Sequence, residues 1–377
     1  MRNIIKSILL ALLVLLSPNF IHASKLAKMA RKSGEIRIKD VSPHKGLNLN
    51  YNYGEMELVF WDKNEIVLKY DECVRASSQK RADEILQQRI AIKSIGGHYF
   101  RVGNADDSSV SFNSKWTVYV PSHISSVAAS NSFGNITVGK GFSGLIRIDV
   151  QNGDVNIPET KAMCVVEVTH GNFYVGNAAY LNMTTKHANG TISFAQTLKV
   201  QADHADFCKI DKADIMTINS KHSKIKVGNV GQLSSQGSYS TLEVNELSGL
   251  ANIRDMQHST IEMDKFLGKL DATDLSYSKL NITISKFNHT PFIMVTDLDY
   301  TDVKVKLPAS LRTSTYVNGK GSCRSISSGT AKIKSSAPWS SPNGVSTHVF
   351  QNTESFTPNS LIDINNESYG TILIEEY

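Results

Sequence analysis

The feature that most constrains the fold is an alternation of apolar and polar residues that recurs at short intervals through the middle of the chain. Residues 222–230 read HSKIKVGNV, and YSTLEVNEL, HSTIEMDKF and YSKLNITIS follow the same pattern further along. In each stretch a small residue opens a run in which every second residue is apolar. A period of two is typical of a β-strand with one buried and one exposed face.

The small residues that open these runs, which we call anchors, are regularly spaced. Most steps between them are 16 to 19 residues long, and the last is 23. The residues two and four places after each anchor are apolar throughout, including Ile192 and Phe194 after Gly190. The ten anchors are Gly134, Gly153, Gly171, Gly190, Asp206, Ser223, Ser240, Ser259, Ser278 and Thr301. Gly, Asp and Ser all favour turns, so we expect a bend at each anchor.

Between successive anchors a second strand fits, as in GLIRIDV and KLDATDL. Each repeat is then strand, turn, strand, turn, a unit that buries its apolar face only by stacking on its neighbours. We therefore predict an all-β fold, a β-solenoid (β-helix) of about ten or more two-strand rungs. A β-sandwich or β-barrel of meandering hairpins is the alternative. The fixed position of the turn residue favours the solenoid, in which every rung bends at the same corner.

Outside the regular block the pattern is weaker. The stretch SQKRADEILQQR predicts one short helix near the N-terminal end, at about residues 79–90, because its apolar residues follow a helical spacing. We expect residues 24–34 to be a linker, 35–120 a β-rich cap that includes the helix, 121–314 the regular solenoid, and 315–377 a loop with strands that close it.

Residues 1–23 have the layout of a secretory signal peptide. MRNIIK is positively charged, SILLALLVLL is an apolar run of ten, and SPNFIHAS ends in small residues. A membrane anchor is the competing interpretation, but a span needs about 20 apolar residues. We expect cleavage after Ala23 or Ser24 and a mature chain in the periplasm, at the cell surface or outside the cell, with peripheral or no membrane association.

Charge and cysteine content exclude some function classes. Removal of Arg2 and Lys6 with the signal peptide leaves 38 basic and 35 acidic residues, a net charge of +3, which is too small to predict a nucleic acid partner. Cysteines Cys73, Cys164, Cys208 and Cys323 lack the paired spacing of a zinc site, so we predict no metal and no cofactor. Cys208 falls on an inward position, where we expect a small buried side chain.

A ring side chain precedes most of the anchors. Phe133 is one, and the six that we take as candidate ligand-binding residues are His170, His222, Tyr239, His258, Tyr277 and Tyr300. Stacked at one corner, such rings seal the turn by offset stacking, which is the first interpretation. In the second, exposed rings bind a sugar or peptide by stacking and hydrogen bonds. A metal or pH-sensitive site is the third, although His187 and His204 are displaced from the frame.

An enzyme must also be considered. Glycosidic cleavage requires paired carboxylates, and the candidates are Asp271, Asp274, Asp297, Asp299 and Asp302. They fall at turns and outward positions, where a solvated charge is the ordinary explanation. The chain has no G-x-S-x-G, H-E-x-x-H or P-loop motif. We therefore predict no catalytic residue, and keep a solenoid carbohydrate-active enzyme, a polysaccharide lyase or hydrolase, as the alternative function.

At the level of the whole pattern the chain resembles a family. YGEMELVFWDKNEIVLKY, WTVYVPSHISSVAASNSFGNITV and NGDVNI resemble the exported adhesin-like β-strand-repeat proteins, the autotransporter-adhesin-head or GIN-type group, over residues 35–377. The resemblance implies a β-solenoid without catalytic activity and with no defined active-site residues. A non-enzymatic envelope or surface protein that presents a rigid face to a glycan or protein is thus the expected function.

Overall fold

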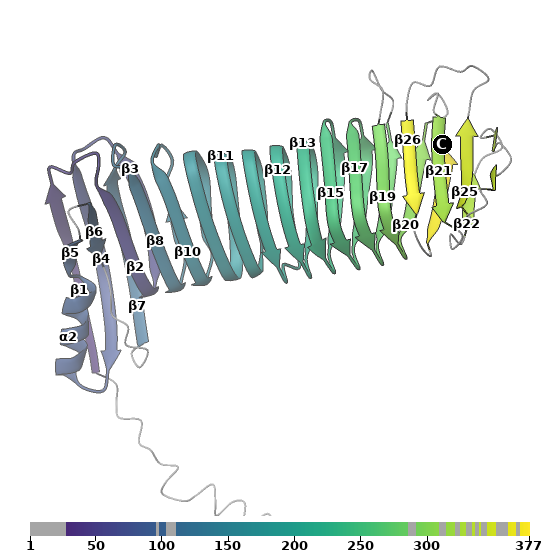
Figure 1. Cartoon of the computed structure of the whole chain (residues 1–377). Coiled ribbons are helices and arrows are strands. Elements are labelled where there is room, and N and C mark those ends of the chain that lie inside the picture. The colour runs from purple at the N-terminus through teal and green to yellow at the C-terminus, as the bar shows by residue number, and fades with distance from the viewer. Residues whose placement is uncertain are drawn as a thin grey trace, which may run out of the picture.

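A computed structural model shows an elongated β-solenoid of about nine turns, and among the residues that the structure describes a short helix lies at its N-terminal end (Figure 1). The prediction of an all-β solenoid is therefore confirmed. The structure describes residues 28–95, 98–102, 111–285, 292–308, 314–320, 325–328, 334–335, 339–340, 345–351, 361–366 and 370–377.

Two parallel sheets enclose one apolar core, and each rung contributes a strand to both. The strands that follow the anchors form the anchor sheet, which includes β9 (Ile136–Val138), β14 (Thr241–Leu247), β16 (Thr260–Phe266), β18 (Lys279–Ile284) and β20 (Asp302–Leu307). The return sheet includes β8 (Ser126–Phe133), β10 (Leu145–Asn152), β15 (Leu250–Gln257), β17 (Lys269–Ser276) and β19 (Phe292–Asp299). The long strands β11 (Val155–Asp203), β12 (Cys208–Lys221) and β13 (Lys224–Ser238) continue around corners and pair in both sheets.

The core consists of columns of apolar side chains that run along the rod. Parallel pairing in register places Leu242 beside Ile225 on one side and Ile261 on the other, and Ile261 beside Leu280. All four side chains are at most 2% exposed. Because no rung buries its own apolar face without the next, the core is continuous from the cap to the C-terminal strands.

At one rung the predicted frame is wrong. Gly190 pairs with Cys208 and therefore stands in the first apolar column, so that Ile192 falls in the second and Phe194 lies outside the core. Phe194 pairs with Lys212, whose Nζ atom lies 5.6 Å from the centre of its ring. The ring of Phe173 fills the space that a side chain at Gly190 would need, approaching to 2.6 Å of its Cβ position. A large residue on one rung thus compensates for a glycine on the next.

At the N-terminal end the chain inserts its first rung between two later ones. β2 (Gly46–Tyr53) lies between β6 (Tyr99–Val102) and β8, and β3 (Glu55–Trp61) lies between β7 (Ser111–Pro121) and β9. Antiparallel strands β4 (Glu65–Ala76) and β1 (Lys28–Lys39) extend one sheet beyond this rung, and β5 (Ile92–Ile95) extends the other. Residues 28–34, expected to be a linker, form the first half of β1.

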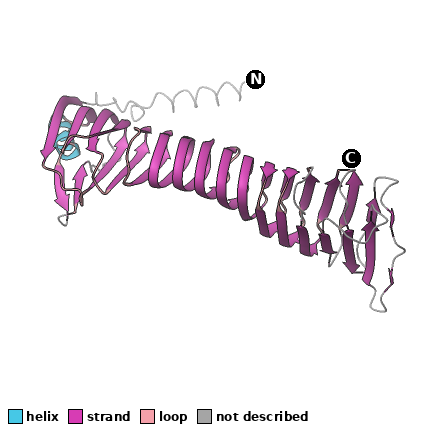
Figure 2. Ribbon diagram, turned by 90° about the horizontal axis from the view of Figure 1, so that it is seen from above, coloured by secondary structure: helices cyan, strands magenta, loops and turns pink. Residues whose placement is uncertain are grey.

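The helix α2 (Gln79–Arg89) packs on β1 and β4 at this end, as Figure 2 shows. Ser78 caps it by accepting a hydrogen bond from the backbone N–H of Arg81. Arg89, at its last turn, donates from Nε to Glu72 over 3.1 Å, and both side chains are at most 1% exposed. Trp116 donates to the same carboxylate. Burial raises the pKa of Glu72 while Arg89 acts to lower it, so the pair fixes the helix to the first rungs.

The C-terminal end repeats the inserted-rung arrangement. β26 (Leu361–Asn366) lies between β19 and β21 (Ser314–Lys320), and β27 (Thr371–Glu376) lies between β20 and β22 (Ser325–Ser328). Figure 1 shows the yellow β26 between green strands. β25 (Val345–Gln351) pairs antiparallel with β21. The short strands β23 (Lys334–Ser335) and β24 (Trp339–Ser340) pair in turn with β25. Strands at both ends therefore cover edges that would otherwise invite association.

Two cysteines lie in the core. Cys164 and Cys208 are fully buried, and burial raises the pKa of each thiol to about 12. Cys73 is also a free thiol, while Cys323 lies outside the described residues. Within the described part of the chain, no helix has the length and apolarity that crossing a bilayer requires. The predicted signal peptide, residues 1–23, lies outside the described part.

Candidate functional site

Eight rings form one stacked column along a corner of the solenoid. Neighbouring ring centroids are 4.7 to 5.0 Å apart, one ring per rung. In order, the rings of this ring column are those of His170, His187, His204, His222, Tyr239, His258, Tyr277 and Tyr300. The six predicted candidates are thus brought together, with two residues that the sequence frame had placed outside the column.

The displacement expected for His187 and His204 is wrong for a simple reason. The structural equivalents of the other anchors are Ala188 and Ala205, which follow these histidines directly, rather than Gly190 and Asp206. His187 lies three residues before Gly190, whereas His204 lies four residues before its partner Cys208. The turn between His204 and Cys208 is one residue longer than the turn between His187 and Gly190. The extra residue moves Asp206 out of the anchor position, but His204 stays in the ring column.

The backbone at the ring column is unusual. Each of the eight residues has a φ angle between 47° and 58°, in the left-handed region. For a residue with a side chain this conformation costs about 1–2 kcal/mol. Stacking of each ring pair contributes about 0.5–1.5 kcal/mol, which offsets part of that cost. The stack therefore stabilises the corner, as the first interpretation of the sequence holds, and it also fixes the direction in which every ring points.

A buried hydroxyl ladder supports the corner in the second half of the rod, from the rung of Ser223 to the rung of Thr301. Its members, Ser223, Ser240, Ser259, Ser278 and Thr301, are at most 5% exposed. Each hydroxyl from Ser240 onward accepts the backbone N–H of the preceding member over 3.1–3.3 Å. Each of the five donates to the carbonyl two residues before it over 2.7–3.0 Å. The hydroxyls thereby satisfy corner N–H groups that neither sheet pairs.

An exposed ladder of amide and carboxylate side chains plays a similar part in the first half of the rod, from the rung of Asn135 to the rung of Phe207. Asn135 Oδ1 accepts the N–H of Asp154 at 2.8 Å, and Asp154 Oδ1 accepts the N–H of Asn172 at 2.9 Å. Two rungs on, Asn189 Oδ1 accepts the N–H of Phe207 at 2.8 Å. The sequence pattern did not predict this ladder, because each of its hydrogen bonds joins residues one whole rung apart.

The stacking limits how the ring column can bind a ligand. Inside the column both faces of a ring are covered by its neighbours, so a sugar cannot stack on them as the second interpretation expects. The edges remain open: Tyr239 and Tyr277 are each 54% exposed and Tyr300 is 45% exposed. What the column offers is a row of phenol hydroxyls and imidazole nitrogens, repeating at the rung spacing.

The same geometry disfavours a metal ion shared between neighbouring histidines. Zinc binds imidazole nitrogen at about 2.0–2.1 Å, which requires two shared nitrogens to lie within about 4.2 Å of each other. The imidazole centroids of neighbouring rungs are 4.7–5.0 Å apart, farther than that limit, and the ring planes are inclined to each other by 6° to 32°. Among the residues that the structure describes, no cluster of three or more His, Cys, Asp or Glu side chains is arranged for a metal.

A hollow of about 320 Å³ lies in the return sheet beside the four successive histidines of the ring column. Thr169, Lys186, Asp203 and Lys221, which line it, directly precede His170, His187, His204 and His222. Thr184 and Gln201 form part of its floor and are hydrogen-bonded to each other over 3.5 Å. This histidine-side hollow therefore lies next to the exposed ring edges of the four histidines.

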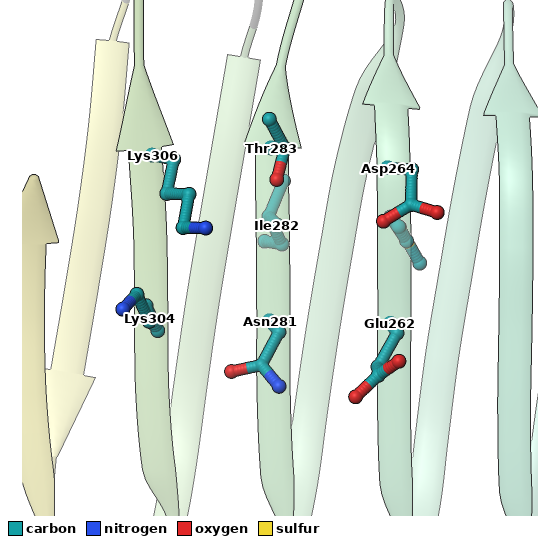
Figure 3. A pocket seen from close by; sticks show the side chains of 8 residues that line it. Glu262, Asp264, Asn281, Ile282, Thr283, Lys304 and Lys306 are labelled. Atoms are coloured by element: carbon teal, nitrogen blue, oxygen red, sulfur yellow. The ribbon is translucent and has the colours of Figure 1, made fainter. Parts of the chain in front are cut away.

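A second hollow, of about 280 Å³, lies in the anchor sheet (Figure 3). Three successive strands line it with two polar side chains each, in the order Glu262 and Asp264, Asn281 and Thr283, Lys304 and Lys306. In Figure 3 the ammonium group of Lys306 points toward the central strand, whereas Lys304 pairs with Glu375 at 2.8 Å. The carboxylates and lysines are two rungs, or about 10 Å, apart.

The five aspartates considered for catalysis lie elsewhere. Asp274 and Asp297 have left-handed backbones, and Thr273 donates to Asp297 over 3.0 Å. Asp271 lies 3.6 Å from Arg254, and Asp302 accepts the N–H of Thr371. Like Asp299, none of them lines either hollow. Four of the five aspartates therefore have structural roles, either in a bend of the backbone or in a contact between rungs.

Comparison with known proteins adds little. No family model matches the chain, and no curated protein matches it. Four chains of solved structures match, one of which is a Clostridium sporogenes protein provisionally described as a cell adhesion protein. That match covers 93% of this chain and 100% of the other, with 10% identity and a TM-score of 0.18, too low to carry an argument. The resemblance to the GIN-type group stays a hypothesis.

Proposed function

We propose that the chain is an exported, non-enzymatic envelope or surface protein, an adhesin-like rod that presents the ring column to a glycan or protein. The observation that carries the proposal is the column itself, in which eight exposed ring edges repeat at one spacing on a continuous core. Residues 1–23 supply the export signal.

A rod of this kind suits binding because its side chains are already ordered. Strand pairing fixes the backbone on both sides of the corner, and stacking fixes each ring. Little further conformational entropy is then lost when a ligand binds, and that loss is a principal cost of association. Repetition also allows an extended ligand to make the same weak contact on several rungs.

Location is the first requirement to test. Intact cells that express the protein are treated with protease, and the mature chain is followed with an antibody beside a known periplasmic protein. Digestion of the chain while the periplasmic control survives is the expected result. Protection of both would place the chain inside the outer membrane and contradict the adhesin-like role.

The alternative is a carbohydrate-active enzyme, and one observation favours it. Glu262 and Asp264 lie two residues apart on one strand of the second hollow, facing amide and amine groups that could hold a sugar acid (Figure 3). Incubation of the purified chain with polygalacturonate and alginate, followed by an assay for new chain ends, tests it. Turnover that disappears in Glu262→Gln with Asp264→Asn would establish this function in place of the first.

A further inference from the structure

We propose that the four successive histidines of the ring column, with the histidine-side hollow, form an acid-gated binding site for a linear acidic polysaccharide. The inference rests on the proposed function and adds to it a ligand class and a pH dependence. It concerns His170, His187, His204 and His222, whose rings stack without interruption.

The surroundings of these histidines carry no excess positive charge at neutral pH. On the return-sheet side stand Asp149, Glu167, Lys186, Asp203 and Lys221, and on the anchor-sheet side Asp154, Asp206 and Lys224. Five carboxylates against three ammonium groups give 3 − 5 = −2, and Lys224 is itself paired with Glu243 at 2.7 Å. The four imidazoles therefore decide the sign of the surface charge: fully protonated, they would change −2 to +2.

Histidine is the side chain that normally gains its proton between pH 8 and pH 5. Adjacent charges about 5 Å apart repel each other by about 0.8 kcal/mol in water. His204 Nδ1 lies 2.7 Å from Asp203 Oδ1. A bound anion reduces the repulsion, and by reciprocity anything that favours protonation favours the anion equally.

The shape of the site indicates a linear chain rather than a small ion or a membrane. The four rungs place the imidazole edges in a straight row about 14 Å long. Beside that row the hollow offers hydroxyl and amide groups from Thr169, Thr184, Gln201 and Asn219. Sugar hydroxyl groups can pair with these while acidic substituents face the imidazoles, whereas a lipid surface would leave them unpaired.

The other half of the ring column provides a matched control. Tyr239, Tyr277 and Tyr300 have the same left-handed backbone as the histidines, and their rings follow their neighbours at a similar spacing of 4.8–5.0 Å. Tyrosine therefore fits this corner, and His187→Tyr with His204→Tyr removes the titrating groups while a ring stays on every rung. The reverse pair, Tyr239→His with Tyr277→His, creates a second run of histidines from His222 to His258.

The test measures binding of the full chain to dextran sulfate, whose sulfate groups stay ionised, at pH 5.5 and pH 7.5 and constant salt. Neutral dextran and anionic phospholipid vesicles are the comparison ligands, and circular dichroism verifies the fold of each variant. We expect dextran sulfate to bind at least about tenfold more tightly at pH 5.5, with net proton uptake. The double tyrosine variant should lose most of that ratio, and the double histidine variant should increase it.

Each contrary result has a defined meaning. Equal affinity at both pH values overturns the acid gating and leaves the proposed function standing, as does an unchanged pH ratio in the double tyrosine variant. Tighter binding to vesicles than to dextran sulfate at pH 5.5 overturns the polysaccharide as ligand. Protease protection on intact cells overturns the proposed function itself, whatever the pH ratio.

Discussion

The corner of the solenoid is built in two ways along the rod. In the first half the ladder groups are amide and carboxylate side chains, exposed to water, that accept an N–H from the following rung. In the second half they are buried hydroxyls that accept an N–H from the preceding rung. The ladders therefore run in opposite directions and solve one problem, the corner N–H that no strand pairs.

The difference indicates in which half the stability of the corner depends on the ladder side chains. Water can replace an exposed acceptor, but a buried N–H that loses its hydroxyl has no other partner close by. The half with the exposed ladder is also the half with three of the four successive histidines, beside the larger hollow. We infer that the second half mainly supports the rod, while the first is free to vary its surface for binding.

The largest effect is expected when the hydroxyl ladder is broken. Ser240→Ala with Ser259→Ala leaves the buried N–H groups of Ser223 and Ser240 without acceptors. At about 1–3 kcal/mol for each unsatisfied group, the double variant should lose about 2–6 kcal/mol of stability. Urea unfolding followed by circular dichroism measures the loss. Ser234→Ala, on the exposed side of the same region, is the control, and a loss equal to the control's would refute the role of the ladder.

A smaller effect is expected when one ring is removed from the column. Tyr277→Asn keeps a residue that tolerates a left-handed backbone but abolishes the stacking with His258 and Tyr300. Two contacts of about 0.5–1.5 kcal/mol each predict a loss of about 1–3 kcal/mol. Thermal unfolding of Tyr277→Asn beside Tyr277→Phe separates the ring from its hydroxyl. An unchanged melting temperature in the Asn variant would show that stacking contributes nothing to the corner.

The smallest effect is expected in the exposed ladder. Asp154→Ala removes the acceptor of the Asn172 N–H, which water can then reach. We expect a loss of less than about 1 kcal/mol, well below that of the hydroxyl double variant. Amide hydrogen exchange at Asn172 should become faster while exchange at Ser223 stays slow. A loss as large as that of the hydroxyl variant would remove the distinction between the two halves.

Much of this fold follows from residue spacing. The alternation predicted strands, the fixed turn position predicted a solenoid, and the rings before the anchors predicted a column. Spacing failed where the structure compensates between rungs, as when Phe173 fills the space beside Gly190, and where the turn after His204 contains an extra residue.

The inserted rungs could not be predicted at all. β2 with β3, and β26 with β27, pair on both sides with strands that are distant in sequence. A repeat pattern indicates that a rung exists but not which rungs lie beside it. The hollows were missed for a related reason, since each is lined by side chains from several rungs, and which of these lie side by side is known only from the register.

The most direct test of the account removes the ring edges and keeps the rings. Phenylalanine at His187, His204 and His222 keeps a ring on every rung but deletes three imidazoles. We measure binding of the triple variant and the wild-type chain to an immobilised glycan panel that includes dextran sulfate, with melting temperatures beside it. The account predicts an unchanged melting temperature and at least about tenfold weaker binding, since each lost hydrogen bond is worth about 0.5–1.5 kcal/mol. Undiminished binding by a stable triple variant would contradict the ring column as the ligand surface.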